Sequence, residues 1–289
     1  MTDRKLENVR VLGVGQLGVA IASFFNGYTM TSALDYNPES MKNYAVDNAL
    51  QLKEFDGGIY QRIDKIINTD KKVIIDNFSS PLLFIVSQID GKFQEAFIPA
   101  LLKLFRSRGI FVGFFPIIPI GADRRKEMEK VNRIKDQIDM VDVLDSEAIL
   151  TNSKNQRILD INVQYYNYIW RKIRSIAKVV ENSTSLGISL HDIKMMTGLY
   201  GPIRVIVLSY PFVNLSIVER DFFDELGKIP REKIKRIYMI MEIGEEMDSD
   251  QLLLFVKKVK NRLSNVDLRQ GFIHTDDEFG LIALNFGSF

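Results

Sequence analysis

Three glycines near the N-terminus have the type and spacing to hold a phosphate group. Gly13, Gly15 and Gly18 follow an apolar run and precede apolar residues that recur at helical spacing. Glycine lets a backbone approach a phosphate closely, and the free N–H groups and dipole of a helix start favour an anion. The pattern therefore predicts a phosphate-binding turn between a strand and a helix.

Asp35 extends this pattern toward dinucleotide chemistry. It closes the next predicted strand, at the place where the acidic residue of a dinucleotide fingerprint binds a ribose hydroxyl. The first hypothesis is therefore an NAD(P)-dependent oxidoreductase that uses Gly13, Gly15, Gly18 and Asp35. The alternative is structural, because glycines at these positions also permit close packing of a strand against a helix.

The histidines add little to the oxidoreductase hypothesis. A hydride-transfer enzyme needs a proton donor or acceptor near its site, and the chain has only His191 and His274. His191 precedes Asp192 at a predicted helix start, where such a pair is typical of a helix cap. His274 lies in a predicted terminal strand and is expected at the surface. No grouping of residues nominates a catalytic histidine.

Composition limits the class of protein and the kind of site. A formal net charge of +1 argues against binding to nucleic acid or to a membrane surface. The absence of cysteine and the presence of two histidines exclude thiolate and His-rich metal sites, so no metal site is predicted. The charged start of the chain lacks a secretory signal, and no apolar run is long enough to span a membrane. We therefore expect a cytoplasmic protein.

The elements that would position the glycine turn alternate between strands and helices. This alternation predicts an α/β fold with a doubly wound parallel sheet. The predicted strands are 9–14, 29–34, 73–75, 82–86, 110–115 and 140–144. The predicted helices follow the glycine turn and Pro38 and then cover residues 93–105 and 123–138.

A long helix and a smaller domain come next. Apolar residues recur at helical spacing along residues 155–180, which is long for a globular helix. Beyond it we predict helices at 190–196 and 250–263 and strands at 204–208, 235–243, 268–275 and 279–285. The last two strands are close enough in sequence to form a hairpin through residues 276–278. The predicted parts are a nucleotide-binding domain (1–154), a central connecting helix (155–182) and a C-terminal α+β domain (183–289).

Taken in order, these elements resemble the FtsZ/tubulin superfamily. Residues 11–18, Val-Leu-Gly-Val-Gly-Gln-Leu-Gly, are similar to the family's first nucleotide loop. Residues 85–109 align without a gap with the family stretch that contains G-G-G-T-G-T-G, and Pro99 and Gly109 fall on its proline and its last glycine. Residues 188–194 are similar to the loop after the family's central helix, and residues 279–286 to its closing strand.

The resemblance implies a cytoskeletal protein of the cell-division type that is a polymer subunit or a partner of one. In this family GTP lies between subunits stacked head to tail, and the loop after the central helix supplies acidic residues to the neighbour's nucleotide. Asp192 is the acidic residue that matches this loop. The implied contacts to GTP or GDP are Gly13, Val14, Gly15, Gln16, Gly18 and Gly91, with Arg125 reaching the phosphates and Asn167 the base. Arg125 is otherwise one charge on a solvated helix face, and Asn167 a polar residue beside the apolar stripe.

The sequence departs from the family pattern at residues that would bind and hydrolyse GTP. Where the family has G-G-G-T-G-T-G, residues 90–96 keep Gly91 and no threonine, and Asp90 and Glu95 place negative charge near the phosphates. Lys92 offsets part of this charge. We therefore predict weak or absent GTP hydrolysis and leave nucleotide binding open, with a non-nucleotide-binding interaction module as a second alternative. The chain lacks the family's linker and tail, so no direct membrane tether is expected.

Overall fold

The structure is a computed structural model that describes residues 5–35, 37–52, 58–89, 91–148, 158–210, 214–244, 248–275 and 279–287. Its contacts divide the chain into two units, Met1–Trp170 and Arg171–Phe289. The boundary falls inside the helix α7 (Ile158–Glu181). The division into three parts at residues 154 and 182 stays a prediction.

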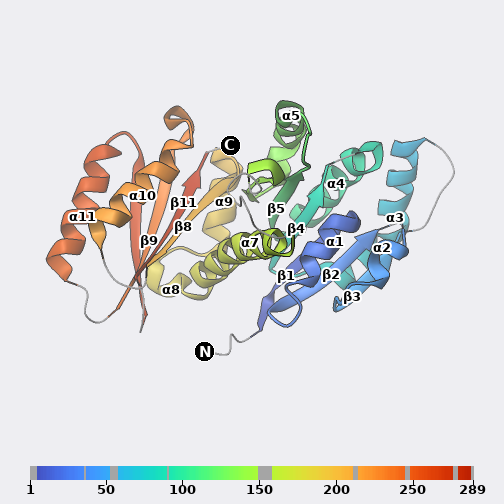
Figure 1. Ribbon diagram of the computed structural model, residues 1–289, viewed down its shortest axis with the longest axis horizontal. Helices are drawn as coiled ribbons and strands as arrows, with labels where there is room; N and C mark the ends of the chain where they lie inside the picture. Colours follow the sequence, from blue (N-terminus) through green and yellow to red (C-terminus); the bar gives the residue numbers. More distant parts are fainter. Residues whose placement is uncertain are drawn as a thin grey trace. The chain divides into compact units, whose positions relative to one another are not determined.

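The first unit is built on a parallel sheet (Figure 1). Its strands follow the order β6-β5-β4-β1-β2-β3, and β7 pairs with β5. Their bounds are β1 (Leu6–Val14), β2 (Thr29–Asp35), β3 (Asn48–Gln51), β4 (Leu82–Gln88), β5 (Phe111–Ile118), β6 (Met140–Val141) and β7 (Leu144–Asp145). The predicted doubly wound parallel sheet is confirmed.

Helices cover both faces of this sheet. Their bounds are α1 (Gly15–Ser23), α2 (Glu39–Lys42), α3 (Ile59–Phe78), α4 (Gly91–Arg106) and α5 (Arg124–Ile134), followed by the 3-10 turn η1 (Lys135–Gln137). Crossovers between parallel strands are right-handed, so α1 and α2 lie on one face and α3 and α4 on the other. Contacts between α1 and α2 and between α3 and α4 agree with this arrangement. The strands between them are almost entirely buried, which explains their continuous apolar sequences.

The predicted strand at residues 73–75 is wrong, because these residues lie within α3. Three consecutive β-branched residues favour a strand locally. The surrounding sequence has a helical stripe of buried residues, Ile63, Ile66, Ile74 and Phe78, which packs on the rest of the unit. Burial along this stripe outweighs the local preference.

Two other predicted elements differ in their extent. The helix predicted for residues 123–138 ends at Ile134 and continues as η1. The strand predicted for residues 140–144 is two short strands, β6 and β7, each paired with β5. Asp142 lies between them and is buried, and its Oδ1 accepts a hydrogen bond from the Tyr168 hydroxyl at 2.7 Å. A buried polar residue at this point interrupts the strand.

The second unit is the smaller α+β part. Its sheet has the order β10-β9-β11-β8, with strands β8 (Ile203–Tyr210), β9 (Arg236–Ile243), β10 (Asp267–His274) and β11 (Phe279–Phe286). Its further elements are α8 (Ser183–Leu186), α9 (Leu190–Tyr200), α10 (Leu215–Gly227), η2 (Arg231–Lys233) and α11 (Ser249–Arg262). Phe222 of α10 and Phe255 of α11 are buried in one apolar cluster with the β9 residues Ile237, Met239 and Met241. Sequence analysis predicted α11 and missed α10.

The predicted hairpin between the last two strands is wrong. β10 pairs in parallel with β9, whereas β11 pairs antiparallel with β9 and with β8. β11 is therefore an inner strand, and its buried apolar residues need neighbours on both edges. Residues 276–278, the predicted hairpin turn, lie outside the described residues.

The predicted long helix is confirmed as α7. Residues 155–157, where the prediction began, lie outside the described residues. Tyr165, Ile169, Ile173 and Ile176 are buried, as the apolar stripe predicts.

Candidate functional site

The first turn joins β1 directly to α1. Val14 is extended, with φ −119° and ψ 126°, and Gly15 begins the helix with a φ of +73°. Val14, at the N-cap position, makes no side-chain hydrogen bond to this helix start. The first N–H groups of a helix have no partner within the helix, and a valine at the N-cap position supplies no side-chain acceptor for those of Gly15, Gln16 and Leu17. Gln16 is exposed, and Gly15 is half-buried.

The three glycines of this turn have different structural roles. A Cβ on Gly13 would lie 2.4 Å from the carbonyl oxygen of Gly18, and one on Gly18 would lie 2.3 Å from the carbonyl oxygen of Val86. Gly13 and Gly18 are therefore required for packing of β1, α1 and β4. Gly15 differs, since the nearest atom to its added Cβ is Nε2 of Gln94 at 3.8 Å. Of the three, Gly15 has the room and the backbone conformation to line a ligand.

A second turn of the same kind lies beside the first. β4 is the neighbour of β1 in the sheet, and the helix after it, α4, begins at Gly91 with a φ of +75°. Asp90, predicted to repel phosphates, lies outside the described residues. The side chain of Gln94 extends from α4 between the two turns.

The topology singles out this pair of turns. After β1 the chain proceeds to β2 and β3 on one side, and later through β4 to β5 on the other. The strand order therefore reverses between β1 and β4, and α1 and α4 leave toward opposite faces. Ligands of open α/β sheets bind outside the carboxyl ends of the strands at such a point. Gly15 and Gly91 both stand at this place.

A lysine pairs with carboxylates near the second turn. Lys130 of α5 donates to the carbonyl oxygen of Ile89 at 2.9 Å and forms ion pairs with Glu95 at 3.0 Å and Glu127 at 2.8 Å. Burial lowers the pKa of Lys130, but hydrogen bonds to Glu127 and Glu95 outweigh it, so the pKa is raised overall. The carboxylate of Glu95, predicted to repel phosphates, is therefore partnered. Lys92, predicted to offset this charge, is exposed.

The sequence matches no protein-family model, and none of the curated proteins is significantly similar to it. Solved structures are similar in fold. FtsZ from M. jannaschii, an empty dimer, has a TM-score of 0.70 and 13% identity over 97% of this chain and 88% of its own. CetZ2 from Haloferax volcanii, a GTPγS-bound protofilament, has a TM-score of 0.67 and 14% identity, covering 98% and 94%. TubZ from Bacillus thuringiensis serovar israelensis, a GTPγS-form protofilament, has a TM-score of 0.72 and 13% identity, covering 97% and 86%.

The chain has an FtsZ/tubulin-like fold. Identities this low concern the fold and not the function. The resemblance first noted in short motifs thus extends to the order and pairing of the strands. In this FtsZ/tubulin-like fold, segment 11–18 contains the glycine turn between β1 and α1, and segment 85–109 includes the end of β4 and all of α4.

Two further residues were predicted to contact the nucleotide, Arg125 and Asn167. Arg125 is the second residue of α5 and not part of the loop before it, and its side chain is 88% exposed and pairs with Glu129 at 3.3 Å. Asn167 is exposed on α7, next to Tyr166. The Tyr166 ring packs on Phe25, 5.0 Å between centroids, just beyond the end of α1 that is opposite Gly15. Their roles as nucleotide contacts stay predictions.

Asp192 lies in a capping box at the start of α9. Its Oδ2 accepts from the Ser189 hydroxyl at 2.6 Å and the Ser189 N–H at 2.8 Å, while its own N–H donates to the Ser189 hydroxyl. The hydroxyl and N–H of Ser189 hold the pKa of Asp192 below its ordinary value. The expectation of a helix cap at His191 and Asp192 is confirmed for Asp192, and its action on a neighbouring subunit stays a prediction.

Asp35 and His274 complete the predicted candidates. Asp35 is buried at the end of β2, and its Oδ1 accepts from the N–H of Asn37 at 3.2 Å, which forms a local turn. His274 ends β10 and is exposed, as expected. In the described part of the chain, no group of three or more His, Cys, Asp or Glu residues could hold a metal ion. No helix among the described residues is long and apolar enough to cross a membrane.

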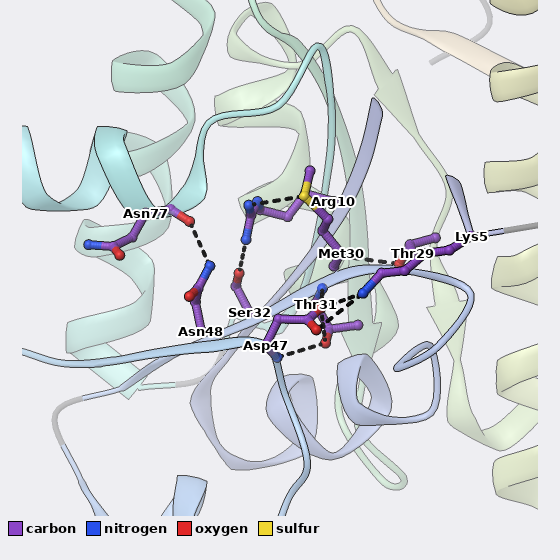
Figure 2. Close-up of polar contacts among 9 residues, drawn as sticks. All are labelled: Lys5, Arg10, Thr29, Met30, Thr31, Ser32, Asp47, Asn48 and Asn77. Atoms are coloured by element: carbon purple, nitrogen blue, oxygen red, sulfur yellow. Dashed lines mark hydrogen bonds and ion pairs between the residues drawn. The ribbon is translucent and has the colours of Figure 1, made fainter. Parts of the chain in front are cut away.

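Sequence analysis missed a polar cluster around Arg10, which lies in β1 before the glycine turn (Figure 2). Arg10, buried in β1, donates to the Ser32 hydroxyl at 2.7 Å and to the Met30 sulfur at 3.4 Å. Asp47 accepts from the Thr31 N–H at 2.7 Å and pairs with Lys5 at 3.2 Å. Burial lowers the pKa of the Arg10 guanidinium, and the charge of Asp47 opposes this shift. These contacts join β1, β2 and the segment before β3, which indicates a role in stability.

Proposed function

We propose that the protein is an FtsZ/tubulin-like cytoskeletal protein of the cytoplasm that binds the phosphates of GTP or GDP at its paired glycine turns. Assembly would be its function, as a polymer subunit or as the partner of one. The fold supports this proposal, because CetZ2 and TubZ with the same fold form GTPγS-bound and GTPγS-form protofilaments.

The paired turns carry the proposal. Two helices begin side by side at the carboxyl ends of β1 and β4, each with a glycine at positive φ. Helix starts supply N–H donors and a favourable dipole to an anion. Gly15 leaves room for close approach, and Lys130 partners the carboxylate of Glu95. These residues suit a phosphate chain, with Val14 and Gln16 completing the first turn.

Hydrolysis would be weak or absent. The family's acidic loop has one counterpart here, Asp192, and its carboxylate is engaged in the cap of α9. An acidic residue that stabilises its own helix is poorly disposed to polarise a water at a neighbouring subunit. The protein would therefore resemble a GTPase in fold while retaining little of its turnover.

Equilibrium binding to the purified protein tests the nucleotide proposal. Labelled GTP, GDP and NADH are titrated at micromolar protein concentration. We expect GTP or GDP to bind and NADH not to bind. Binding of NADH alone would overturn the proposal in favour of an oxidoreductase that uses Gly13, Gly15, Gly18 and Asp35.

Exposed apolar side chains support assembly. Met195 and Leu199 lie one turn apart on α9 and are 53% and 71% exposed. Ile120, 66% exposed, follows β5 at the sheet edge that bears the glycine turns. Large apolar side chains exposed to solvent favour contact between copies of a protein. The partner would be a second copy or another FtsZ/tubulin-like subunit.

A charge substitution on α9 tests this contact. Leu199→Glu should reduce the pelleted or filamentous fraction several-fold, seen by sedimentation and electron microscopy with and without GTP. Leu253→Glu on α11 is the matched control, because Leu253 is also exposed, at 53%. A wild-type protein that stays monomeric under every condition would rule out the filament.

The competing proposal is an interaction module that binds no nucleotide. It is supported by Gly13 and Gly18, whose packing roles explain two of the three glycines without a ligand. Such a module would assemble or bind a partner without responding to GTP or GDP. The same titration separates the two proposals.

A further inference from the structure

The strand β10 is the edge of the second unit's sheet, and it lacks the features that usually protect an edge. Among the described residues, β10 pairs only with β9. Proteins commonly protect an edge strand by keeping it short or by adding proline, lysine or a bulge. The edge strand of the first unit, β3, is four residues long, whereas β10 has eight residues in unbroken register with β9 and contains neither proline nor lysine.

The backbone of β10 directs every second pair of hydrogen-bonding groups away from β9. The N–H of Asp267, the first residue of the strand, donates to the carbonyl oxygen of Lys235 on the β9 side. Along a strand, alternate residues bond to one neighbour and the residues between them face the other side. The N–H and C=O groups of Leu268, Gln270 and Phe272 therefore point to the open edge.

Both faces of β10 are packed within the second unit. On one face, Leu268 packs against the apolar cluster of α10, α11 and β9. On the other face, a Cβ on Gly271 would lie 2.6 Å from the Leu186 side chain of α8. Phe272 is on the same face as Leu268 and is 38% exposed. The strand is therefore held in place by its faces, and its edge is the side left for a partner.

The sequence of β10 is complementary to itself in an antiparallel pair centred on Gln270. In that register, Leu268 of each strand lies opposite Phe272 of the other, and such apolar pairs stabilise a sheet. Arg269 lies opposite Gly271, so no two like charges face each other directly. A pair centred one residue earlier would place Arg269 opposite its own copy, which is unfavourable. A pair centred one residue later would lose both apolar pairs.

We propose that β10 is a docking edge for the β10 strand of a second copy, which pairs with it antiparallel across a two-fold axis at Gln270. The contact uses neither the glycine turns nor α9, so it is additional to the assembly proposed above. A two-fold contact closes after two copies, whereas a repeating contact continues. Pairing of two single strands buries little surface, so the contact belongs to the weak class.

A single engineered cysteine tests both the contact and its register. The chain contains no cysteine, so Gln270→Cys places its one thiol opposite the same thiol of the second copy. Directly opposite residues that exchange both hydrogen bonds have Cα atoms about 5.5 Å apart, within reach of a disulfide. In mild oxidant and without nucleotide, Gln270→Cys should form several-fold more disulfide-linked dimer on a non-reducing gel than Gln251→Cys. Gln251 is an exposed glutamine on α11 and provides the matched control.

Phe272→Cys is the control for register. In the proposed pair its two thiols would lie about 14 Å apart along the strands, too far for a disulfide. Cross-linking of Phe272→Cys equal to that of Gln270→Cys would overturn the proposed pairing. Equal cross-linking of Gln270→Cys and Gln251→Cys would overturn the docking edge itself, since the dimers would then come from random collision.

Gln270→Lys tests the contact without an oxidant. It would place two ammonium groups opposite each other at the axis, which is unfavourable. The dimer fraction seen by sedimentation velocity at high protein concentration should fall several-fold in Gln270→Lys and stay at the wild-type level in Gln251→Lys. Equal dimer fractions in the two variants would contradict the proposal, and their urea midpoints show whether any loss comes from unfolding. Because these measurements contain no nucleotide, their failure leaves the proposed GTP or GDP binding standing.

Discussion

β1 contributes to two polar regions, and they differ in where their polar groups point. At Arg10, most donors and acceptors of β1, β2 and the segment before β3 pair with one another, and Nε of Arg10 has no partner among the described residues. At Gly15, backbone donors begin a helix whose N-cap residue, Val14, supplies no side-chain acceptor. A region that consumes its own hydrogen-bonding groups stabilises the fold, whereas a region that leaves donors open can bind something else.

The glycine turn itself combines both properties. Gly13 and Gly18 are held in backbone contact with their neighbours, so they belong to the packing of the sheet. Gly15 and Gly91 share a positive φ and have no backbone in the way. One motif thus contains residues that position the site and residues that would line it. Substitutions can separate the two roles.

The largest effect is expected for Gly18→Ala. The added Cβ would lie 2.3 Å from the carbonyl oxygen of Val86, and neither backbone can move without disturbing the sheet. We expect a loss of about 3 kcal/mol in the free energy of unfolding. Urea denaturation followed by circular dichroism measures it. An unchanged midpoint would show that α1 and β4 are not packed as closely as described.

A smaller loss is expected at Arg10, where charge and packing can be separated. Arg10→Ala removes the buried stem as well as the charge and should cost about 2 kcal/mol. Arg10→Met keeps most of the apolar volume and removes a guanidinium whose Nε has no hydrogen-bond partner among the described residues. The free energy of unfolding of Arg10→Met should therefore lie within about 1 kcal/mol of the wild-type value. Equal losses in both variants would mean that the charge itself stabilises the fold.

Gly15→Ala should affect binding more than stability. Its φ of +73° is shared by Gly121, and an added Cβ meets nothing closer than 3.8 Å at Gly15 and nothing within 4 Å at Gly121. Both alanine variants should lose about 1 kcal/mol of stability from backbone strain. GDP affinity should fall about tenfold only in Gly15→Ala, since its methyl group would enter the phosphate space. A similar affinity loss in Gly121→Ala would assign the effect to strain instead.

Local pattern was sufficient to predict the frame of this site. The strand, glycine turn and helix at Gly13–Gly18 depend on residues adjacent in sequence, and alternation of elements predicts the parallel sheet. The separate roles of the glycines were not predictable, because Gly18 meets Val86 on another strand. The predicted hairpin failed for the same reason: β9 lies between β10 and β11, and sequence proximity says nothing about it.

The sequence alone could not show which side chains point toward the glycine turns, and this limited the prediction of the site residues. Gln94 was visible in the sequence as part of a lost phosphate loop, but its reach toward Gly15 depends on the placement of α4 beside β1. The available signal was that Gln94 lies in the first turns of α4, the helix that follows β4, and β4 is the strand next to β1 and its glycine turn. Arg125 was nominated by its residue type; its side chain pairs with Glu129, and its role as a phosphate contact stays a prediction.

The smallest expected effect is a pH dependence at Asp47, which tests whether the Arg10 cluster is a stabilising one. Burial raises the pKa of Asp47, but the Thr31 N–H, Lys5 and the Thr31 hydroxyl outweigh this, so the pKa is lowered overall. A carboxyl group with a lowered folded pKa stabilises the fold above its unfolded pKa of about 3.9 and loses this contribution as the pH falls through the folded value. The side chain is 34% exposed, so solvent screening keeps the contribution below about 1 kcal/mol.

The wild type should therefore exceed Asp47→Asn in unfolding free energy between about pH 5 and pH 7, and the difference should shrink below about pH 4. Urea titrations of both proteins at each pH measure this difference. A difference that stays constant into the acid range would mean that the carboxylate charge contributes nothing to stability. The hydrogen bonds of Asp47 would then act through geometry alone.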